Sequence, residues 1–291
     1  MKTVPRPLVI IAFAATLVSA EGYAEEPGLS SLPDEGLSLR LARHLVQAPD
    51  AARLALPSAT RSGRTQLALR SARENLSNGS PDWTDSGLEV VHEFERRKVL
   101  IGSFVESSRY GLTDRTLTAE GYYPFSERAT GYLLVAASDT HLVLARDTVH
   151  AQLAYALRDG WGVMAGLKHA TYNATVVDIA DLTVERYFSD FRAAFTVLPA
   201  HSSTAGNATS YRFQFGYYYG EENRVQLFLS RGTEVDRPAG ESLIAATTVR
   251  GNALAGRHWL SGAWALDYVV ARTVQGSVIR TGAGVGLRYR F

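Results

Sequence analysis

His169 and Thr171 form the most familiar catalytic combination of residue types in the sequence. Residues two apart on one strand share a face, so a hydroxyl would lie beside an imidazole, the arrangement of an activated nucleophile. Such a nucleophile also needs an acid that orients the imidazole, and the sequence by itself places none there. The same residues fit an ordinary strand that runs into a loop. We favour the ordinary strand and expect no enzymatic activity.

A second set of charged residues is suited to guiding solutes rather than reacting with them. Each lies in or beside a segment in which apolar and polar residues alternate, which would put its side chain on the polar face of a strand. If such strands close into a barrel, rings of charge inside it would tune the selectivity of a pore. Equally, opposite charges could pair across a narrow interior and seal it. Both interpretations stay open for this set of lumen candidates: Arg158, Arg212, Arg280, Arg288, Arg290 and Glu120.

Several other chemistries are excluded or unsupported by composition and motifs. The sequence contains no cysteine, which excludes disulfide bonds, thiolate metal sites and cysteine nucleophiles. It has no nucleophile elbow, phosphate-binding loop or HExxH motif. Its seven histidines are scattered, and its formal net charge of +1 gives no reason to expect a nucleic acid partner. We therefore expect no metal, no cofactor and no nucleic acid.

The elements that position the charged residues are strands, and the C-terminal one shows the pattern most clearly. Counting back from Phe291 to Ile279, mostly apolar residues occupy every second position. Arginines and glycines fill the alternate positions back to Arg280. The alternation is longer than the roughly 9–11 residues that a tilted strand needs to cross a bilayer. One face suited to lipid and one suited to water predict a transmembrane strand.

The same period of two recurs over residues 83–291. Within Tyr211–Tyr219, for example, aromatic residues alternate with Arg212, Gln214 and small residues. We count about thirteen candidate strands from Gly87 onward, and bacterial single-chain barrels have even numbers. The sequence therefore predicts an all-β membrane protein, an antiparallel transmembrane β-barrel of about twelve strands, with fourteen as the alternative.

Residues 1–24 have the features of a secretory signal peptide. Lys2 and Arg6 precede an apolar run of about eleven residues, and small residues then offer cleavage after Ala20 or Ala24. The apolar run is shorter than the roughly 20 residues that a transmembrane helix requires. We therefore expect the chain to be exported and the signal to be removed.

Residues 25–82 lack the strand alternation. Leucine and alanine recur there at helical spacing, for example over Leu67–Leu76, which predicts a short periplasmic α-helical segment. The segment resembles a degenerate tetratricopeptide unit, although repeat units usually need several neighbours to bury a core. A plug or spacer and a partner-binding surface are both compatible with it.

Four short motifs carry a family resemblance. They are Gly121–Pro124, Gly131–Leu133, Leu157–Val163 and the Arg-Tyr-Arg-Phe terminus. With them, the region from Trp83 to Phe291 resembles the YaiO-type outer-membrane barrels. The resemblance implies a bacterial outer-membrane location and a barrel, and it implies little about activity. The layout is also similar to exopolysaccharide-export porins, which place tetratricopeptide repeats before a C-terminal barrel.

These resemblances imply a function and two alternatives. The leading expectation is a non-enzymatic channel, or an accessory, for the passage of envelope polysaccharide or small polar solutes. A structural barrel that docks a periplasmic protein through residues 25–82 is the alternative. The third is a lipid-modifying hydrolase, because the stretch around His169 is similar to the His-x-Ser-Asn segment of outer-membrane lipid A deacylases, with Thr171 in place of the serine.

The C-terminus implies a further partner. Phe291, with Tyr289 and Leu287 on the same strand face, resembles the recognition signal of outer-membrane barrel substrates. This resemblance implies that the barrel-assembly machinery binds Phe291. The other expected partners are outer-membrane lipid and lipopolysaccharide, and either a polysaccharide or a periplasmic protein at residues 25–82.

Overall fold

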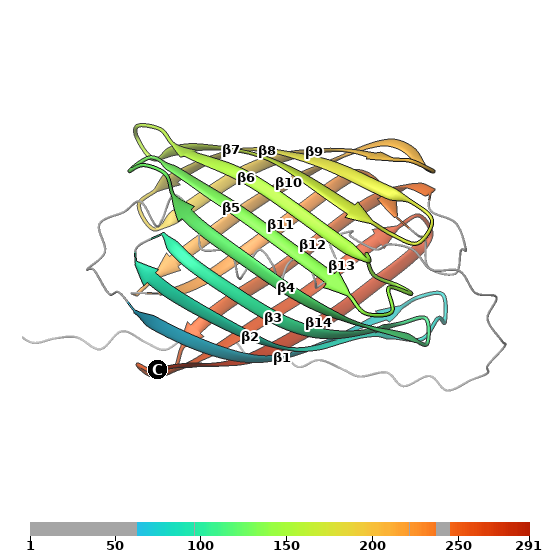
Figure 1. Cartoon of the computed structure of the whole chain (residues 1–291), viewed down its shortest axis with the longest axis horizontal. Helices are drawn as coiled ribbons and strands as arrows, with labels where there is room; N and C mark the ends of the chain where they lie inside the picture. The colour runs from blue at the N-terminus through green and yellow to red at the C-terminus, as the bar shows by residue number, and fades with distance from the viewer. Residues whose placement is uncertain (1–62, 96, 221, 237–244) are drawn as a thin grey trace, which may run out of the picture.

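The residues that the structure describes form a closed barrel of fourteen antiparallel strands (Figure 1). The computed structural model describes residues 63–95, 97–220, 222–236 and 245–291. Each strand pairs with its neighbours in sequence, and β1 pairs with β14 to close the ring. The strands are β1 (Arg64–Leu76), β2 (Trp83–Glu95), β3 (Lys98–Arg109), β4 (Leu112–Pro124), β5 (Ala129–Ser138), β6 (Asp147–Ala156), β7 (Trp161–Thr171), β8 (Val176–Phe188), β9 (Phe191–Ser202), β10 (Gly206–Tyr219), β11 (Asn223–Asp236), β12 (Ala245–Trp259), β13 (Trp264–Gln275) and β14 (Val278–Arg290).

The predicted antiparallel barrel is confirmed, but the preferred number of twelve strands is wrong. Strands β2 to β14 follow one another from Trp83, which agrees with the count of about thirteen. The additional strand is β1, so the barrel begins at Arg64, and the helix predicted over Leu67–Leu76 is wrong. This segment is rich in good helix formers, but pairing with β2 and β14 on both sides overrides that preference. Residues 1–24 and 25–62, with the expected signal peptide and the remaining helical segment, lie outside the described residues.

The strands have one apolar face and one polar face, and the apolar face is on the outside. Leu69, Leu117 and Leu167 are 62%, 66% and 71% exposed, whereas Arg280 and Arg288 are each 1% exposed. Strands of 10 to 15 residues span about 33–50 Å at roughly 3.3 Å per residue, enough to cross a bilayer while tilted. The outer face is therefore suited to lipid. Among the described residues, no helix has the length and apolar character needed to cross a membrane.

The two ends of the barrel differ in their connections. We call the end that holds the start of β1 and the end of β14 the near end, and the opposite end the far end. Near-end connections are two to four residues long, whereas far-end connections range from two to eight residues and include 77–82 and 139–146. Bacterial outer-membrane barrels have short periplasmic turns and longer extracellular loops. In the outer-membrane barrel that the sequence predicts, this pattern places the near end on the periplasmic side.

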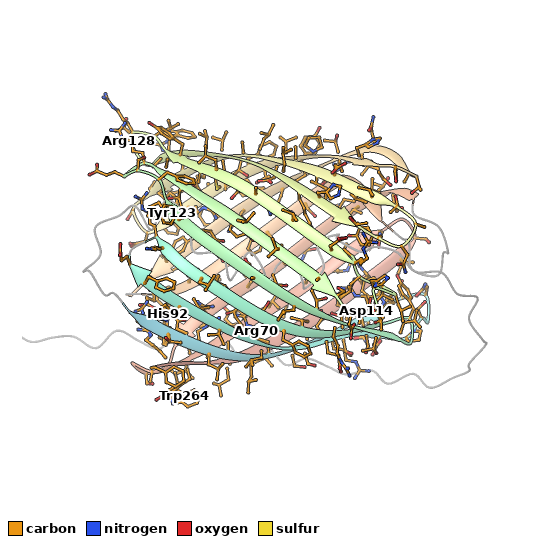
Figure 2. All side chains as sticks on the ribbon, viewed as in Figure 1. Arg70, His92, Asp114, Tyr123, Arg128 and Trp264 are labelled. Atoms are coloured by element: carbon orange, nitrogen blue, oxygen red, sulfur yellow. The ribbon has the colours of Figure 1, made fainter. Side chains whose placement is uncertain are left out.

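Aromatic side chains gather on the outer face at the near end. Trp264 packs against Tyr289 with ring centroids 4.7 Å apart, and Phe191 stacks on Tyr217 at 5.0 Å. Figure 2 shows Tyr123 and Trp264 at this end, at the left of the view. Aromatic residues are enriched where a barrel meets the membrane–water interface. This near-end aromatic belt comprises Phe94, Tyr123, Phe125, Tyr155, Trp161, Phe188, Phe191, Tyr217, Trp264, Tyr289 and Phe291.

Candidate functional site

A cluster of charged side chains covers the inside of the barrel where it closes. Arg70 of β1 donates to Glu89 of β2 at 2.9 Å and to Asp267 of β13 at 3.1 Å. Arg288 of β14 donates to the same two carboxylates at 2.6 and 3.1 Å. Arg257 of β12 donates to Asp267 at 2.5 Å. We call these five residues the seam cluster, because they connect five neighbouring strands across the β1–β14 junction (Figure 2 labels Arg70).

A glycine makes room for this cluster. Gly286 of β14 lies opposite Arg70 on one side and Asp267 on the other. A Cβ at this position would lie 2.8 Å from Cγ of Arg70 and 3.4 Å from Cβ of Asp267. A cavity of about 20 Å³ lies beside these residues, which is enough for one water molecule. The side chain of Arg70 can therefore extend across β14 to reach Asp267 on β13, because Gly286 has no side chain in its path.

Positive charge exceeds negative charge in this region. Three arginines of the seam cluster face two carboxylates, and Arg224 of β11 lies opposite Arg257 in the strand register. Arg224 is 8% exposed, and its Nε and Nη2 have no hydrogen-bond partner among the described residues. A buried charge without a partner is unfavourable. This wall of the barrel is therefore suited to an anion.

The wall on the other side of the ring carries carboxylates. Asp181 of β8 accepts hydrogen bonds from Gln152 at 2.5 Å and pairs with His150 at 2.8 Å. Glu120 of β4 accepts a bond from the Tyr132 hydroxyl at 3.0 Å. In the closed order of strands, β4 to β8 stand across from β11 to β1. The interior therefore has an arginine-rich side and a side with paired carboxylates.

Ion pairs also connect distant strands at the near end. Glu222, in the turn after β10, accepts bonds from Arg64 of β1 and Arg290 of β14, both at 2.6 Å. Arg64 also donates to Glu93 of β2 at 3.0 Å, and Arg290 lies over the Trp259 ring, 3.4 Å from its centroid. This group ties the β10–β11 turn to the seam at the periplasmic mouth.

The two-faced barrel and its charged interior agree with one family of membrane proteins. The model of the YaiO membrane beta barrel domain matches residues 64–237. The chain belongs to this family. It is therefore a protein of the bacterial outer membrane, and the predicted location is confirmed.

Solved structures with similar folds include a channel, an outer membrane protein and a porin, and they differ strongly in sequence from this YaiO-family chain. The CymD monoaromatic hydrocarbon channel is 10% identical, with a TM-score of 0.49 over 83% of this chain and 90% of that one. The outer membrane protein Omp33 of Acinetobacter baumannii is 10% identical, with a TM-score of 0.48 over 79% and 100%. An anion-selective porin from Comamonas acidovorans is 10% identical, with a TM-score of 0.41 over 80% and 100%. No curated protein sequence matches the chain.

The YaiO-family barrel brings some of the lumen candidates together. Arg288 belongs to the seam cluster, and Arg290 to the ion pairs at the near end. Arg280 lies near the far end with its guanidinium carbon 4.8 Å from the centroid of the Trp83 ring. The three arginines of β14 therefore lie at three heights along the β1–β14 junction, from the near end to the far end.

The other lumen candidates lie apart from the seam. The side chains of Arg212 and Glu120 are on the inner faces of β10 and β4. Arg158 lies in the exposed turn after β6, not on a strand. Sequence reasoning missed Arg70 because its segment was assigned to a helix. It could have found Asp267, because strand alternation places that residue on the polar face of β13.

One loop at the far end is held by a buried carboxylate. Asp114, on the inner face of β4, accepts hydrogen bonds from the backbone N–H groups of Leu142, Val143 and Leu144 at 2.9, 2.7 and 2.8 Å. The Thr140 hydroxyl donates to the same carboxylate at 2.5 Å. Val143 and Leu144 are each 2% exposed. The connection between β5 and β6 is therefore folded toward the inside of the barrel; Figure 2 shows Asp114 at this end.

A neighbouring carboxylate in the same connection is exposed. Asp139 accepts hydrogen bonds from the backbone N–H groups of Arg115 at 2.9 Å and of Thr140 at 2.6 Å. These bonds favour the charged form and lower the pKa of the Asp139 carboxyl below its usual value.

The candidate nucleophile lies on the outer face. His169 Nδ1 is 2.7 Å from a carboxylate oxygen of Asp178 on β8, so the structure supplies the acid that the sequence could not place. Both side chains are more than half exposed. Among the described residues, no hydrogen bond joins His169 to Thr171, and an activated hydroxyl would need that contact.

Proposed function

We propose that this barrel is a non-enzymatic channel for small polar solutes and that it prefers anions. The supporting observation is the surplus of positive charge at the seam cluster and Arg224. Charges that line a pore attract ions of opposite sign and raise their local concentration. Arg224, which has unused donors and little exposure, is the residue that contributes most to this preference.

The width of the barrel supports the same proposal. Fourteen strands about 4.8 Å apart and tilted by about 40° enclose a backbone cylinder roughly 28 Å across. Eight-stranded barrels are filled by their own side chains, whereas barrels of 16–18 strands leave an aqueous channel. An acidic envelope polysaccharide is the larger candidate solute, because its carboxylates would meet the same arginines. Residues 25–62, the part of the predicted periplasmic segment that precedes β1, are the proposed contact for a periplasmic partner.

Substitution of Arg224 by glutamine is expected to reduce the preference for anions. One unit charge at about 4 Å is worth about 1 kcal/mol even in water, so the ratio of anion to cation permeability should fall by about fivefold. The measurement is the reversal potential of single channels in planar bilayers under a salt gradient. Arg115→Gln, on the outer face of β4, is the matched control and should leave the ratio unchanged. Absence of conductance steps in the parent protein would refute the channel itself.

We also propose that the barrel-assembly machinery recognises Phe291. Its backbone N–H donates to the Thr65 carbonyl at 3.0 Å, and its ring lies 5.0 Å from that of Tyr289, while the side chain is 72% exposed. Deletion of Phe291 should reduce the amount of folded barrel in the outer membrane several-fold. The measurement is the fraction of the protein that migrates faster on a gel when the sample is not heated. Phe291→Tyr should retain most of it. Equal amounts for the deletion and the parent would contradict the proposal.

A further inference from the structure

A ring of charged and polar side chains follows the apolar band on the outer face at the far end. In most of this far-end ring, opposite charges neutralise each other. Arg115 of β4 donates to Glu106 of β3 at 3.0 Å, and His169 of β7 pairs with Asp178 of β8 at 2.7 Å. The strand register places these partners side by side. This part of the ring therefore needs no external counterion.

Three exposed arginines depart from this pattern. Arg231, Arg250 and Arg272 lie on the outer faces of β11, β12 and β13, and none has an ion pair or side-chain hydrogen bond within the part of the chain that the structure describes. Arg231 is directly opposite Arg250 in the register, and like charges at opposed positions repel each other. Arg272 is opposite Asn252, which is two residues from Arg250. We call these three residues the arginine patch.

The arginine patch lies at the edge of the lipid-facing band. On β11, Leu227 and Leu229 precede Arg231, and on β13 the outward residues from Trp264 to Val270 are mostly apolar before Arg272. From Trp264 to Arg272 the strand rises about 26 Å at roughly 3.3 Å per residue. At a tilt of about 40° this corresponds to roughly 20 Å along the barrel axis, and a long arginine side chain that extends toward the headgroups covers the remainder of the roughly 25 Å apolar band of outer-membrane barrels. The guanidinium groups are therefore at the level where lipid headgroups begin.

We propose that the arginine patch binds the phosphate of a phosphorylated glycolipid, the lipid A part of lipopolysaccharide. The far end carries the longer loops and so faces the outer leaflet, which consists of this lipid. Guanidinium groups match phosphate with paired hydrogen bonds, and a phosphate would relieve the repulsion between Arg231 and Arg250. Asn252, exposed between two of the arginines, offers an amide to a sugar hydroxyl. The apolar residues below would contact the acyl chains. This site does not depend on the channel.

The test is lipid binding by the purified full-length barrel in detergent, followed by native mass spectrometry. The probes are lipid A with both phosphates, the same glycolipid after its phosphates are removed, and phosphatidylglycerol. We expect the parent protein to prefer phosphorylated lipid A over both other lipids. The double variant R231Q/R250Q should bind phosphorylated lipid A at least about tenfold more weakly, because it loses charge-assisted hydrogen bonds to the phosphate.

Arg115→Gln is the matched control, because Arg115 belongs to the same ring but is paired with Glu106. Its affinity for lipid A should equal that of the parent. The shift between heated and unheated samples on a gel establishes that each variant is folded, and Arg272→Gln replaces the double variant if that one does not assemble. Unchanged affinity of the patch variants would overturn the proposal. So would equal binding of the dephosphorylated glycolipid, or of phosphatidylglycerol, by the parent.

Discussion

Substitution of Asp267 by asparagine is expected to lower the free energy of unfolding of the barrel by about 3–5 kcal/mol, because it leaves buried arginines without their shared partner. The Asp267 carboxylate accepts bonds from Arg70, Arg257 and Arg288 at 2.5 to 3.3 Å, and it is 5% exposed. Asparagine keeps the shape of the side chain and removes the charge. The measurement is the urea dependence of the folded fraction in lipid vesicles.

The matched control is Asp178→Asn on the outer face. Asp178 is also paired, with His169, but both groups are exposed, so the loss should stay below about 1 kcal/mol. A double variant with Arg257→Gln should recover part of the stability lost by Asp267→Asn, because it removes one of the unpaired charges. Equal stabilities of the parent and Asp267→Asn would show that the seam cluster does not hold the barrel closed.

Substitution of Asp114 by alanine is expected to release the connection between β5 and β6. The variant loses the acceptor for three backbone N–H groups and for the Thr140 hydroxyl, and each unsatisfied buried donor costs about 1–3 kcal/mol. Opening of the loop is then more favourable than keeping it folded inward, because the open loop lets water satisfy these donors. Amide hydrogen exchange at Val143 and Leu144 should accelerate by about 100-fold or more.

Hydrogen exchange followed by mass spectrometry of the loop peptide measures this effect. Asp147→Asn is the control, because Asp147 is half-exposed at the start of β6 and pairs with Arg146. Strand peptides far from the loop, such as those of β13, report whether the barrel itself is intact. Exchange in Asp114→Ala that matches the parent would mean that Asp114 does not hold the loop.

Strand alternation by itself determined the architecture of this protein. Side chains on a strand point alternately to two faces whatever the strand pairs with, so β14 could be recognised from Phe291 back to Arg280. The same reasoning placed Arg212 on a polar face. It failed at β1, where Leu67, Ala68 and Leu69 are consecutive and alanine occupies inward positions. There the period of two is weak, and helix-forming residues gave the opposite signal.

Tertiary structure alone decided which residues act together. Arg70 and Arg288 are far apart in sequence, and they meet because the ring closes between β1 and β14. The same closure and register bring Asp267 between three arginines and place Arg231 opposite Arg250. A linear pattern gives the face on which a side chain lies, but it does not give the residue across from it. That depends on which strands pair and in which register, and these are properties of the whole closed sheet.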